Sequence, residues 1–251
     1  MREARPISDP VRLLLVRHGQ TDWNREGRYQ GRSDPPLAPE GSASVKALAE
    51  RLRGVPIAAL LTSPLRRAAE TADLLAQALG LPPPQIDPRL TELAFGAWEG
   101  LTQAEVKARW PQSLRAWKRA PDTVRFPGGE DLAAVDARLA DLLRTRPWEG
   151  DRSGSASSGS AILLVTHAGP IRLLRLAAEG RKPAEFRRIE VGPASLHVLD
   201  LHRLPQQDPH PDRHERRPSL ASCGGLAAVA SLRVGPRSYL VAAKPSEHQP
   251  N

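Results

Sequence analysis

The dipeptide Arg17-His18 has residue types that could capture a phosphoryl group. It follows a short apolar run at residues 12–16 and is followed by Gly19. A neutral histidine has a free ring nitrogen that can act as a nucleophile. A neighbouring arginine can neutralise phosphate oxygens through two parallel hydrogen bonds, and a glycine lets the backbone approach a ligand closely.

His167 repeats this arrangement in the second half of the chain. It follows the apolar run at residues 161–166 and precedes a second apolar stretch with helical spacing that begins at Ala168-Gly169. Backbone amides at the start of that helix, including the amide of Ala168, could face an anion. A capping or buried structural histidine is the alternative reading of His167.

Two further regions could add charged groups to the same site. Residues 58–62 form another apolar run, and Arg66 and Arg67 follow it closely. We favour Arg67 as a site residue, because Arg66 is more simply explained as a surface side chain. Glu92 follows a short segment at residues 85–87 and could serve as a general acid, although most glutamates are only solvated.

The spacing of apolar residues predicts an α/β protein. Strands are expected at residues 12–16, 58–62, 161–166 and 194–201, with a short one at 85–87. Helices are expected from Ser63-Pro64 to about residue 79, from Thr102, over 130–145 and over 169–178. Strands that alternate with helices indicate a mostly parallel central sheet with helices on both faces, in three layers. The carboxyl ends of such strands meet at one edge, where ligands bind.

Composition and missing motifs argue against several classes of protein. The net charge is +8, but the basic residues are not interleaved with aromatic residues as on a nucleic-acid-binding surface. No apolar run is long enough to span a membrane. Metal-ligand spacings and phosphate-binding glycine loops are absent from the sequence, so we expect no metal and no cofactor. The single cysteine and the lack of a secretory signal favour a cytoplasmic protein.

The chain divides into three parts. We expect an N-terminal extension at residues 1–10, a domain at 11–203, and a Pro/Arg/His-rich tail at 204–251. The tail lacks apolar periodicity and should be largely disordered, with one weak strand near residues 239–243. A Ser/Gly-rich loop at residues 150–160 interrupts the domain before the strand at 161–166.

Several motifs appear in an order that resembles the histidine phosphatase superfamily, also called phosphoglycerate-mutase-like. They are Arg-His-Gly-Gln-Thr-Asp-Trp-Asn (17–24), Gly-Arg-Tyr-Gln-Gly-Arg-Ser-Asp (27–34), Ser-Pro-Leu-Arg-Arg-Ala (63–68), Leu-Ala-Phe-Gly-Ala-Trp-Glu-Gly (93–100), Pro-Gly-Gly-Glu (127–130) and Thr-His-Ala-Gly (166–169). The resemblance covers roughly residues 11–201. It implies the three-layer fold of that family and a phosphoryl-transfer activity.

The resemblance also implies roles for individual residues. His18 matches the nucleophile that becomes phosphohistidine, and Glu92 matches the proton donor. The phosphate pocket is matched by Arg17, Arg67, His167 and Asn24, and a loop that touches substrate by Gln30 and Gly31. Phosphoryl transfer depends mainly on positioning and charge neutralisation, which these groups can supply without a metal.

The resemblance favours the phosphatase branch of the family. Cofactor-dependent mutases carry a basic, tyrosine-bearing insertion near Trp117, and this chain lacks it. Asp131 stands where the family often has serine, which predicts a weaker contact at one helix start. We expect a small phosphorylated metabolite as substrate; a mutase and a non-catalytic binding relative are the alternatives, and the oligomeric state, including a homodimer, stays open.

Overall fold

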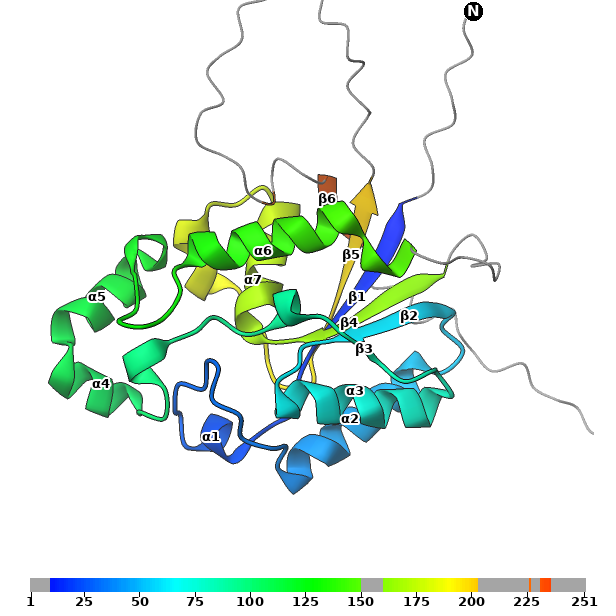
Figure 1. Ribbon diagram of the computed structural model, residues 1–251, viewed down its shortest axis with the longest axis horizontal. Coiled ribbons are helices and arrows are strands. Elements are labelled where there is room, and N and C mark those ends of the chain that lie inside the picture. The colour runs from blue at the N-terminus through cyan, green and yellow to red at the C-terminus, as the bar shows by residue number, and fades with distance from the viewer. Residues whose placement is uncertain (1–9, 150–159, 203–225, 227–230, 236–251) are drawn as a thin grey trace, which may run out of the picture.

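The computed structural model describes residues 10–149, 160–202, 226 and 231–235. These residues form a six-stranded sheet between two layers of helices (Figure 1). The predicted loop at 150–160 lies almost entirely outside the described residues, and the predicted strand near 239–243 lies wholly outside them. In the described part of the chain, no helix is long and apolar enough to cross a membrane.

The central sheet is mostly parallel, as the sequence predicts. Its strands are β1 (Val11–Arg17), β2 (Ile57–Thr62), β3 (Gln85–Ile86), β4 (Ala161–Thr166), β5 (Leu196–His202) and β6 (Ser231–Val234). They lie in the order β3-β2-β4-β1-β5-β6, and β5 runs antiparallel to both of its neighbours. The two central strands, β4 and β1, are buried from both sides and read as continuous apolar runs, which is typical of parallel sheets.

The pairing of β1 with β4 brings the two histidine motifs together. The strands are parallel, and Arg17 pairs with Thr166 at their last position. The backbone N–H of His18 then donates to the carbonyl of Thr166 over 2.9 Å. Because strands β1 and β4 end at the same level, His18 and His167 lie side by side at the carboxyl edge of the sheet.

Helices cover both faces of this sheet (Figure 1). One face packs on α2 (Pro39–Leu52) and α3 (Arg66–Leu79), and the other on α6 (Leu132–Thr145) and α7 (Ala168–Ala178). Alternate residues of β1 point to opposite layers: Leu14 joins the α2/α3 core, whereas Leu13 joins the α6/α7 core. The predicted three-layer α/β class is therefore confirmed.

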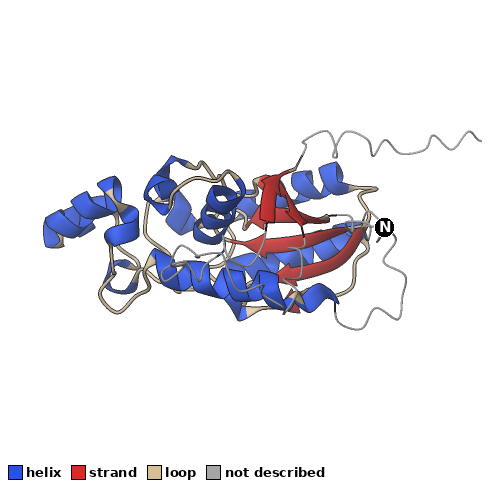
Figure 2. Cartoon of the chain, turned by 90° about the horizontal axis from the view of Figure 1, so that it is seen from above, coloured by secondary structure: helices blue, strands red, loops and turns tan. Residues whose placement is uncertain are grey.

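Shorter helices lie beyond the ends of the strands. They are α1 (Asp22–Arg25), α4 (Gln103–Arg109) and α5 (Pro111–Arg119). In Figure 2 the helices at the left edge reach past the strands and form an extension of the molecule. The capping box predicted at Thr102 is present, since Thr102 and Glu105 each accept a hydrogen bond from the other's backbone N–H.

The helix predicted from Ser63-Pro64 begins later, at Arg66. The hydroxyl of Ser63 accepts from the N–H of Leu65 over 3.2 Å and lies 2.8 Å from Nε2 of His167. Ser63 is therefore committed to the turn and to the histidine, so it does not cap the helix. Helix α2 was not predicted, although its first turn contains Pro39 and its buried residues Val45, Leu48 and Leu52 have helical spacing.

Asp131 makes a stronger helix start than its departure from the family pattern predicts. It is the N-cap of α6, and its carboxylate accepts from the N–H of Ala134 over 2.9 Å. Aspartate caps a helix as well as serine does, and its charge also suits the positive end of the helix dipole. The expected weakening is therefore wrong.

The sheet continues past the domain boundary predicted at residue 203. Strand β6 pairs antiparallel with β5, and both Leu226 and Leu232 are buried. The N–H of Leu226 donates to Oδ2 of Asp136 on α6 over 3.0 Å. Without β6 the chain would leave β5 as an exposed sheet edge, which explains why these residues join the core.

Nested truncations test whether β6 belongs to the domain. A chain ending at residue 235 should unfold at the same urea concentration as the full chain. A chain ending at residue 203 should lose at least about 2 kcal/mol of unfolding free energy, because burying a leucine side chain contributes about 1.5–3 kcal/mol. Equal stability of all three chains, measured by urea unfolding with circular dichroism, would show that β6 contributes nothing to the core.

Candidate active site

A cavity opens at the carboxyl ends of β1 and β4. Its volume is about 230 Å³, and it is lined by Arg17, His18, Asn24, Arg28, Tyr29, Gln30, Gly31, Arg67, Glu92, Phe95, Ala168 and Arg172. Every site residue predicted from the sequence lines it except His167. The ring of His167 lies beside that of His18, with 5.1 Å between the ring centroids.

His18 is held as a neutral imidazole, and its Nε2 accepts a hydrogen bond from Nε of Arg67 over 3.3 Å. Its Nδ1 lies 2.7 Å from the carbonyl oxygen of Gly19, and since a carbonyl only accepts, Nδ1 carries the proton. Nε2 therefore keeps its lone pair. Burial, together with the charges of Arg17 and Arg67, lowers the pKa of His18 well below its usual value. The side chain meets the requirements of a nitrogen nucleophile.

Arg67 is a fully buried cation that faces this nucleophile. Its Nε lies 3.3 Å from Nε2 of His18, and its two Nη atoms donate to the backbone oxygens of Ser33 and Gly31, each over 2.8 Å. These neutral acceptors fix the plane of the guanidinium without cancelling its charge. The charge is therefore available to an anion in the cavity.

Arg17 approaches the cavity from the end of β1. Its Nη1 donates to the carbonyl of Val191 over 2.7 Å, whereas its buried Nε has no hydrogen-bond partner among the described residues. Burial lowers the pKa of Arg17 to about 10, so it stays charged at neutral pH. A buried donor without a partner costs free energy, and a bound anion would relieve that cost.

Two more buried polar atoms at the site lack partners within the described residues: Nδ1 of His167 and Oε1 of Gln30. The other ends of these side chains are anchored. Nε2 of His167 meets the hydroxyl of Ser63 over 2.8 Å, and Nε2 of Gln30 donates to the hydroxyl of Thr21 over 2.8 Å. Such half-satisfied groups around one cavity indicate a site prepared for a polar ligand.

Glu92 presents its carboxyl group to the same cavity. Its Oε1 accepts from the N–H groups of Leu93 and Gly169, over 2.9 and 3.0 Å, and its Oε2 makes no hydrogen bond within the described residues. A side chain at Gly169 would collide with Oε1 of Glu92, so only glycine allows this contact. One carboxyl oxygen is fixed in place, and the other is available to carry a proton.

The loop that contains Gly31 is tied down by Glu99, a residue that the sequence analysis did not single out. Glu99 accepts from the N–H groups of Arg32, Ser33 and Phe95, over 2.8–3.0 Å. Gly31 has a φ of 53°, and a side chain there would collide with Glu99. The loop whose carbonyls hold Arg67 is thus fixed by the partly buried carboxylate of Glu99.

Asn24 belongs to a small capping unit at the cavity wall. Its Oδ1 accepts from the N–H of Thr21 over 3.1 Å, and its own N–H donates to the Thr21 hydroxyl. The predicted role of Asn24 as a phosphate-pocket residue therefore concerns its Nδ2, which makes no hydrogen bond within the described residues.

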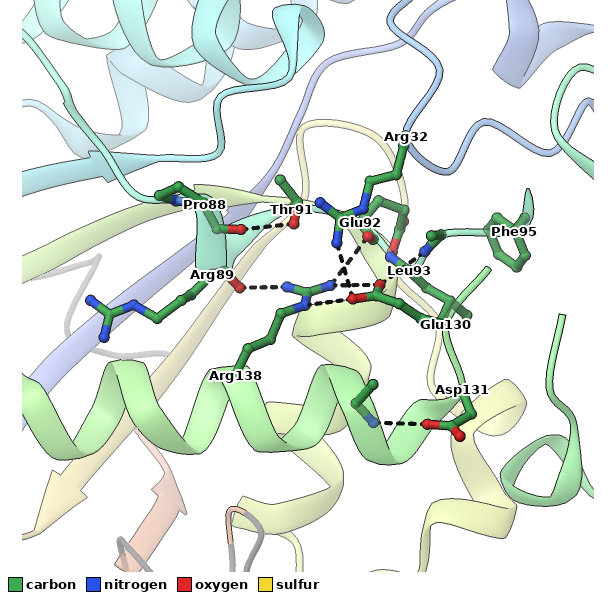
Figure 3. A network of polar contacts seen from close by, with 12 residues as sticks. Arg32, Pro88, Arg89, Thr91, Glu92, Leu93, Phe95, Glu130, Asp131 and Arg138 are labelled. Carbon is green, nitrogen blue, oxygen red and sulfur yellow. Dashed lines mark hydrogen bonds and ion pairs between the residues drawn. The ribbon is translucent and has the colours of Figure 1, made fainter. Parts of the chain in front are cut away.

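A network behind Glu92 positions its backbone (Figure 3). Arg138 of α6 donates to the carbonyl oxygens of Arg89 and Glu92, over 2.5 and 3.1 Å. It also pairs with Glu130, 3.3 Å away, and Glu130 in turn pairs with Arg32 over 3.0 Å. The segment that carries Glu92 is thereby linked both to a core helix and to the loop at Gly31.

Four residues that line the cavity were not predicted from the sequence: Arg28, Tyr29, Phe95 and Arg172. Arg172 could have been found, because it lies one helical turn after Ala168 on α7 and so shares its face. The other three belong to motifs that the sequence analysis quoted without assigning individual roles. Among the described residues, no group of three or more His, Cys, Asp or Glu side chains could hold a metal ion.

Comparisons with known proteins point to one family. A sequence model of the histidine phosphatase superfamily (branch 1) matches residues 13–206. Phosphoserine phosphatase 1 of Hydrogenobacter thermophilus is 34% identical over 194 residues, which make up 76% of this chain and 87% of that protein. Bifunctional protein Rv2228c of Mycobacterium tuberculosis is 40% identical over 195 residues, or 77% of this chain but 51% of that protein. A solved structure of mycobacterial glucosyl-3-phosphoglycerate phosphatase Rv2419c with VO3 superposes with a TM-score of 0.64 and 33% identity, covering 76% of this chain and 92% of its own.

The burial of two neutral histidines makes stability depend on pH. The pKa values of His18 and His167 are both lowered in the folded state, chiefly by burial. Below roughly pH 6.5, the usual histidine pKa, the unfolded chain therefore binds more protons than the folded one. We expect the unfolding free energy to fall as pH drops below this value, by up to about 1.4 kcal/mol per pH unit for each histidine.

Urea unfolding at several pH values measures this dependence. His18→Asn and His167→Asn should each reduce the pH dependence of the unfolding free energy below pH 6.5 by the contribution of one histidine. This expectation holds whatever each substitution does to stability at pH 8. An unchanged slope in both variants would mean that the two rings already carry a proton in the folded protein.

Proposed function

The chain belongs to the histidine phosphatase superfamily, and we propose that it is a phosphoric monoester hydrolase that uses His18 as its nucleophile. The observation that carries this proposal is the lone pair on Nε2 of His18, 3.3 Å from the buried guanidinium of Arg67. A neutral nucleophile beside fixed positive charge suits attack on a phosphate dianion, because the cations offset its negative charge.

The first step forms a bond between Nε2 of His18 and phosphorus and breaks the ester P–O bond. Arg17 and Arg67 neutralise the non-bridging oxygens while the phosphoryl group moves. The protonated carboxyl group of Glu92 gives its proton to the departing oxygen, so the product leaves as a neutral alcohol. His18 then carries the phosphoryl group, and Glu92 is a carboxylate.

The second step returns the enzyme to its starting state. A water oxygen attacks phosphorus and the P–N bond breaks, while the Glu92 carboxylate takes the water's proton. Inorganic phosphate leaves, His18 recovers its lone pair, and Glu92 is again protonated. All groups in this cycle belong to the chain itself, so the mechanism we propose needs no metal and no cofactor.

The proposed substrates are small phosphorylated metabolites. The cavity of about 230 Å³ has room for a compact ester beside the phosphoryl group. Relatives bear the names phosphoserine phosphatase and glucosyl-3-phosphoglycerate phosphatase, and both names describe esters of this kind. Asn24, Gln30, Gly31 and the amide of Ala168 are the proposed substrate contacts, since all four line the cavity.

Trapping of the covalent intermediate tests the nucleophile. Wild-type protein mixed with a labelled phosphate ester in the presence of a chelator, then denatured at alkaline pH, should retain label on the peptide that contains His18. That label should be lost in acid, because the P–N bond of phosphohistidine is acid-labile. His18→Asn should neither take up label nor release phosphate, although it keeps the fold.

Normal turnover by His18→Asn would overturn the assignment of the nucleophile. Conversion of a phosphoglycerate to its isomer without net release of phosphate would instead identify a mutase. Loss of wild-type activity on adding the chelator, with recovery on adding one divalent ion, would contradict the metal-free mechanism.

A Glu92→Gln variant tests the proposed acid, because glutamine keeps the shape of the side chain but cannot donate the proton. An alkyl phosphate should lose on the order of 10²–10⁴ in the rate of the first step, the usual size of general acid catalysis. A nitrophenyl phosphate should lose much less, since its leaving group needs little protonation. Rapid-mixing kinetics separate this step from hydrolysis of the phosphoenzyme, and equal losses for both esters would mean that Glu92 is not the acid.

A further inference from the structure

Arg172 is a cavity-lining cation that the proposed reaction does not use. It lies on α7, four residues after Ala168, and both residues line the cavity. Residues four apart on a helix share one face. Arg172 therefore lies on the cavity wall, one turn away from the helix start that borders His18.

The other cations of the cavity already have a purpose or a partner. Arg17 and Arg67 adjoin His18, and Arg28 pairs with the carboxylates of Glu26 and Glu105 over 2.5 and 3.4 Å. Arg172 differs from Arg28, because no carboxylate of the described residues lies within ion-pair distance of it.

The surroundings of Arg172 hold its side chain in place without neutralising it. Its Nε donates to the carbonyl oxygen of Ile189 over 2.9 Å, its only hydrogen bond within the described residues. Its guanidinium carbon lies 5.3 Å from the centroid of the Phe186 ring, which supports the flat face of the group. The remaining N–H groups are free to meet a ligand.

The electrostatics of this wall also favour a second negative charge. Burial lowers the pKa of Arg172, and the nearby charge of Arg187 lowers it further, whereas Glu92 raises it. Glu92 acts in the same way on Arg17 and Arg67, so its charge is shared among three arginines and does not balance Arg172 alone. A partly buried cation without a counterion is costly unless a ligand supplies one.

We propose that Arg172 binds a carboxylate on the alcohol portion of the substrate, which makes phosphate monoesters of hydroxy acids the preferred class. This inference rests on the proposed phosphatase function. A guanidinium matches the two oxygens of a carboxylate with two parallel hydrogen bonds. A rigid helix and an aromatic support preorganise the group, so little entropy is lost when it binds.

A matched pair of substrates tests the proposal on the wild-type protein. 3-Phosphoglycerate and glycerol 3-phosphate differ only in a carboxylate that replaces a hydroxymethyl group. We expect kcat/KM to favour 3-phosphoglycerate by roughly 10- to 100-fold, the size of a charge-assisted hydrogen bond. O-Phosphoserine and O-phosphoethanolamine form a second such pair and should show the same preference. Equal values within both pairs would overturn the proposal.

Variants of Arg172 locate the preference. Arg172→Gln should remove most of the preference for 3-phosphoglycerate by raising the KM of that substrate. The KM of glycerol 3-phosphate should change less than about threefold. Arg172→Lys keeps the charge but not the fork, so it should retain part of the preference. Arg175→Gln is the matched control, because Arg175 lies on the same helix, pairs with Glu179 and does not line this cavity. It should behave as the wild type.

The outcomes separate this inference from the function on which it rests. Equal losses for both esters of a pair in Arg172→Gln, with a shifted pH profile of kcat, would mean that Arg172 acts through Glu92, and this would overturn the proposal. If Arg172→Gln does not fold, the wild-type pairs and Arg172→Lys still decide the question. If the wild type also fails to hydrolyse nitrophenyl phosphate, the phosphatase function itself is wrong.

Discussion

The fully buried guanidinium of Arg67, placed against the neutral ring of His18, is the constraint on which the rest of the site depends. A cation without water needs acceptors, and here it receives the backbone oxygens of Gly31 and Ser33 in place of a carboxylate. The choice matters, because a carboxylate in contact would cancel the field that a phosphate ester needs. Glu99 instead accepts from the backbone N–H groups of Arg32 and Ser33, and it thereby fixes the loop that carries these carbonyls.

The same principle governs the acid. In the mechanism we propose, Glu92 must be held accurately and must also exchange a proton. One of its oxygens accepts from two backbone N–H groups, and the other makes no hydrogen bond within the described residues. Arg138, paired with Glu130, donates to the backbone carbonyl of Glu92. It therefore positions the backbone of Glu92 without contacting the carboxyl group. Buried polar atoms without partners among the described residues, such as Nε of Arg17, lower stability, and a bound anion would offset that cost.

The sheet makes this precision possible. Strands β1 and β4 are buried on both faces and pair in register up to Arg17 and Thr166, so the two histidines leave the sheet at fixed neighbouring positions. Four helices hold these strands from both sides (Figure 1). Binding sites on loops gain accuracy when they begin at such rigid edges. The position of Arg172 follows from the same arrangement, because α7 starts directly at His167.

The sequence by itself determined the class of fold and predicted the residues of the site, because both depend on short local patterns. Apolar runs that end at His18 and at His167 mark buried strands, and parallel strands deliver their ends to one edge. The tertiary structure decided what depends on distant partners. Ser63 could cap a helix in isolation, but it contacts His167 instead; β6 has no strong periodicity and becomes a strand because β5 offers an open edge. The roles of Glu99 and Arg138 could not be read from the chain, because many arginines and glutamates look alike in sequence. What distinguishes them is the burial and the set of partners that only the folded protein provides.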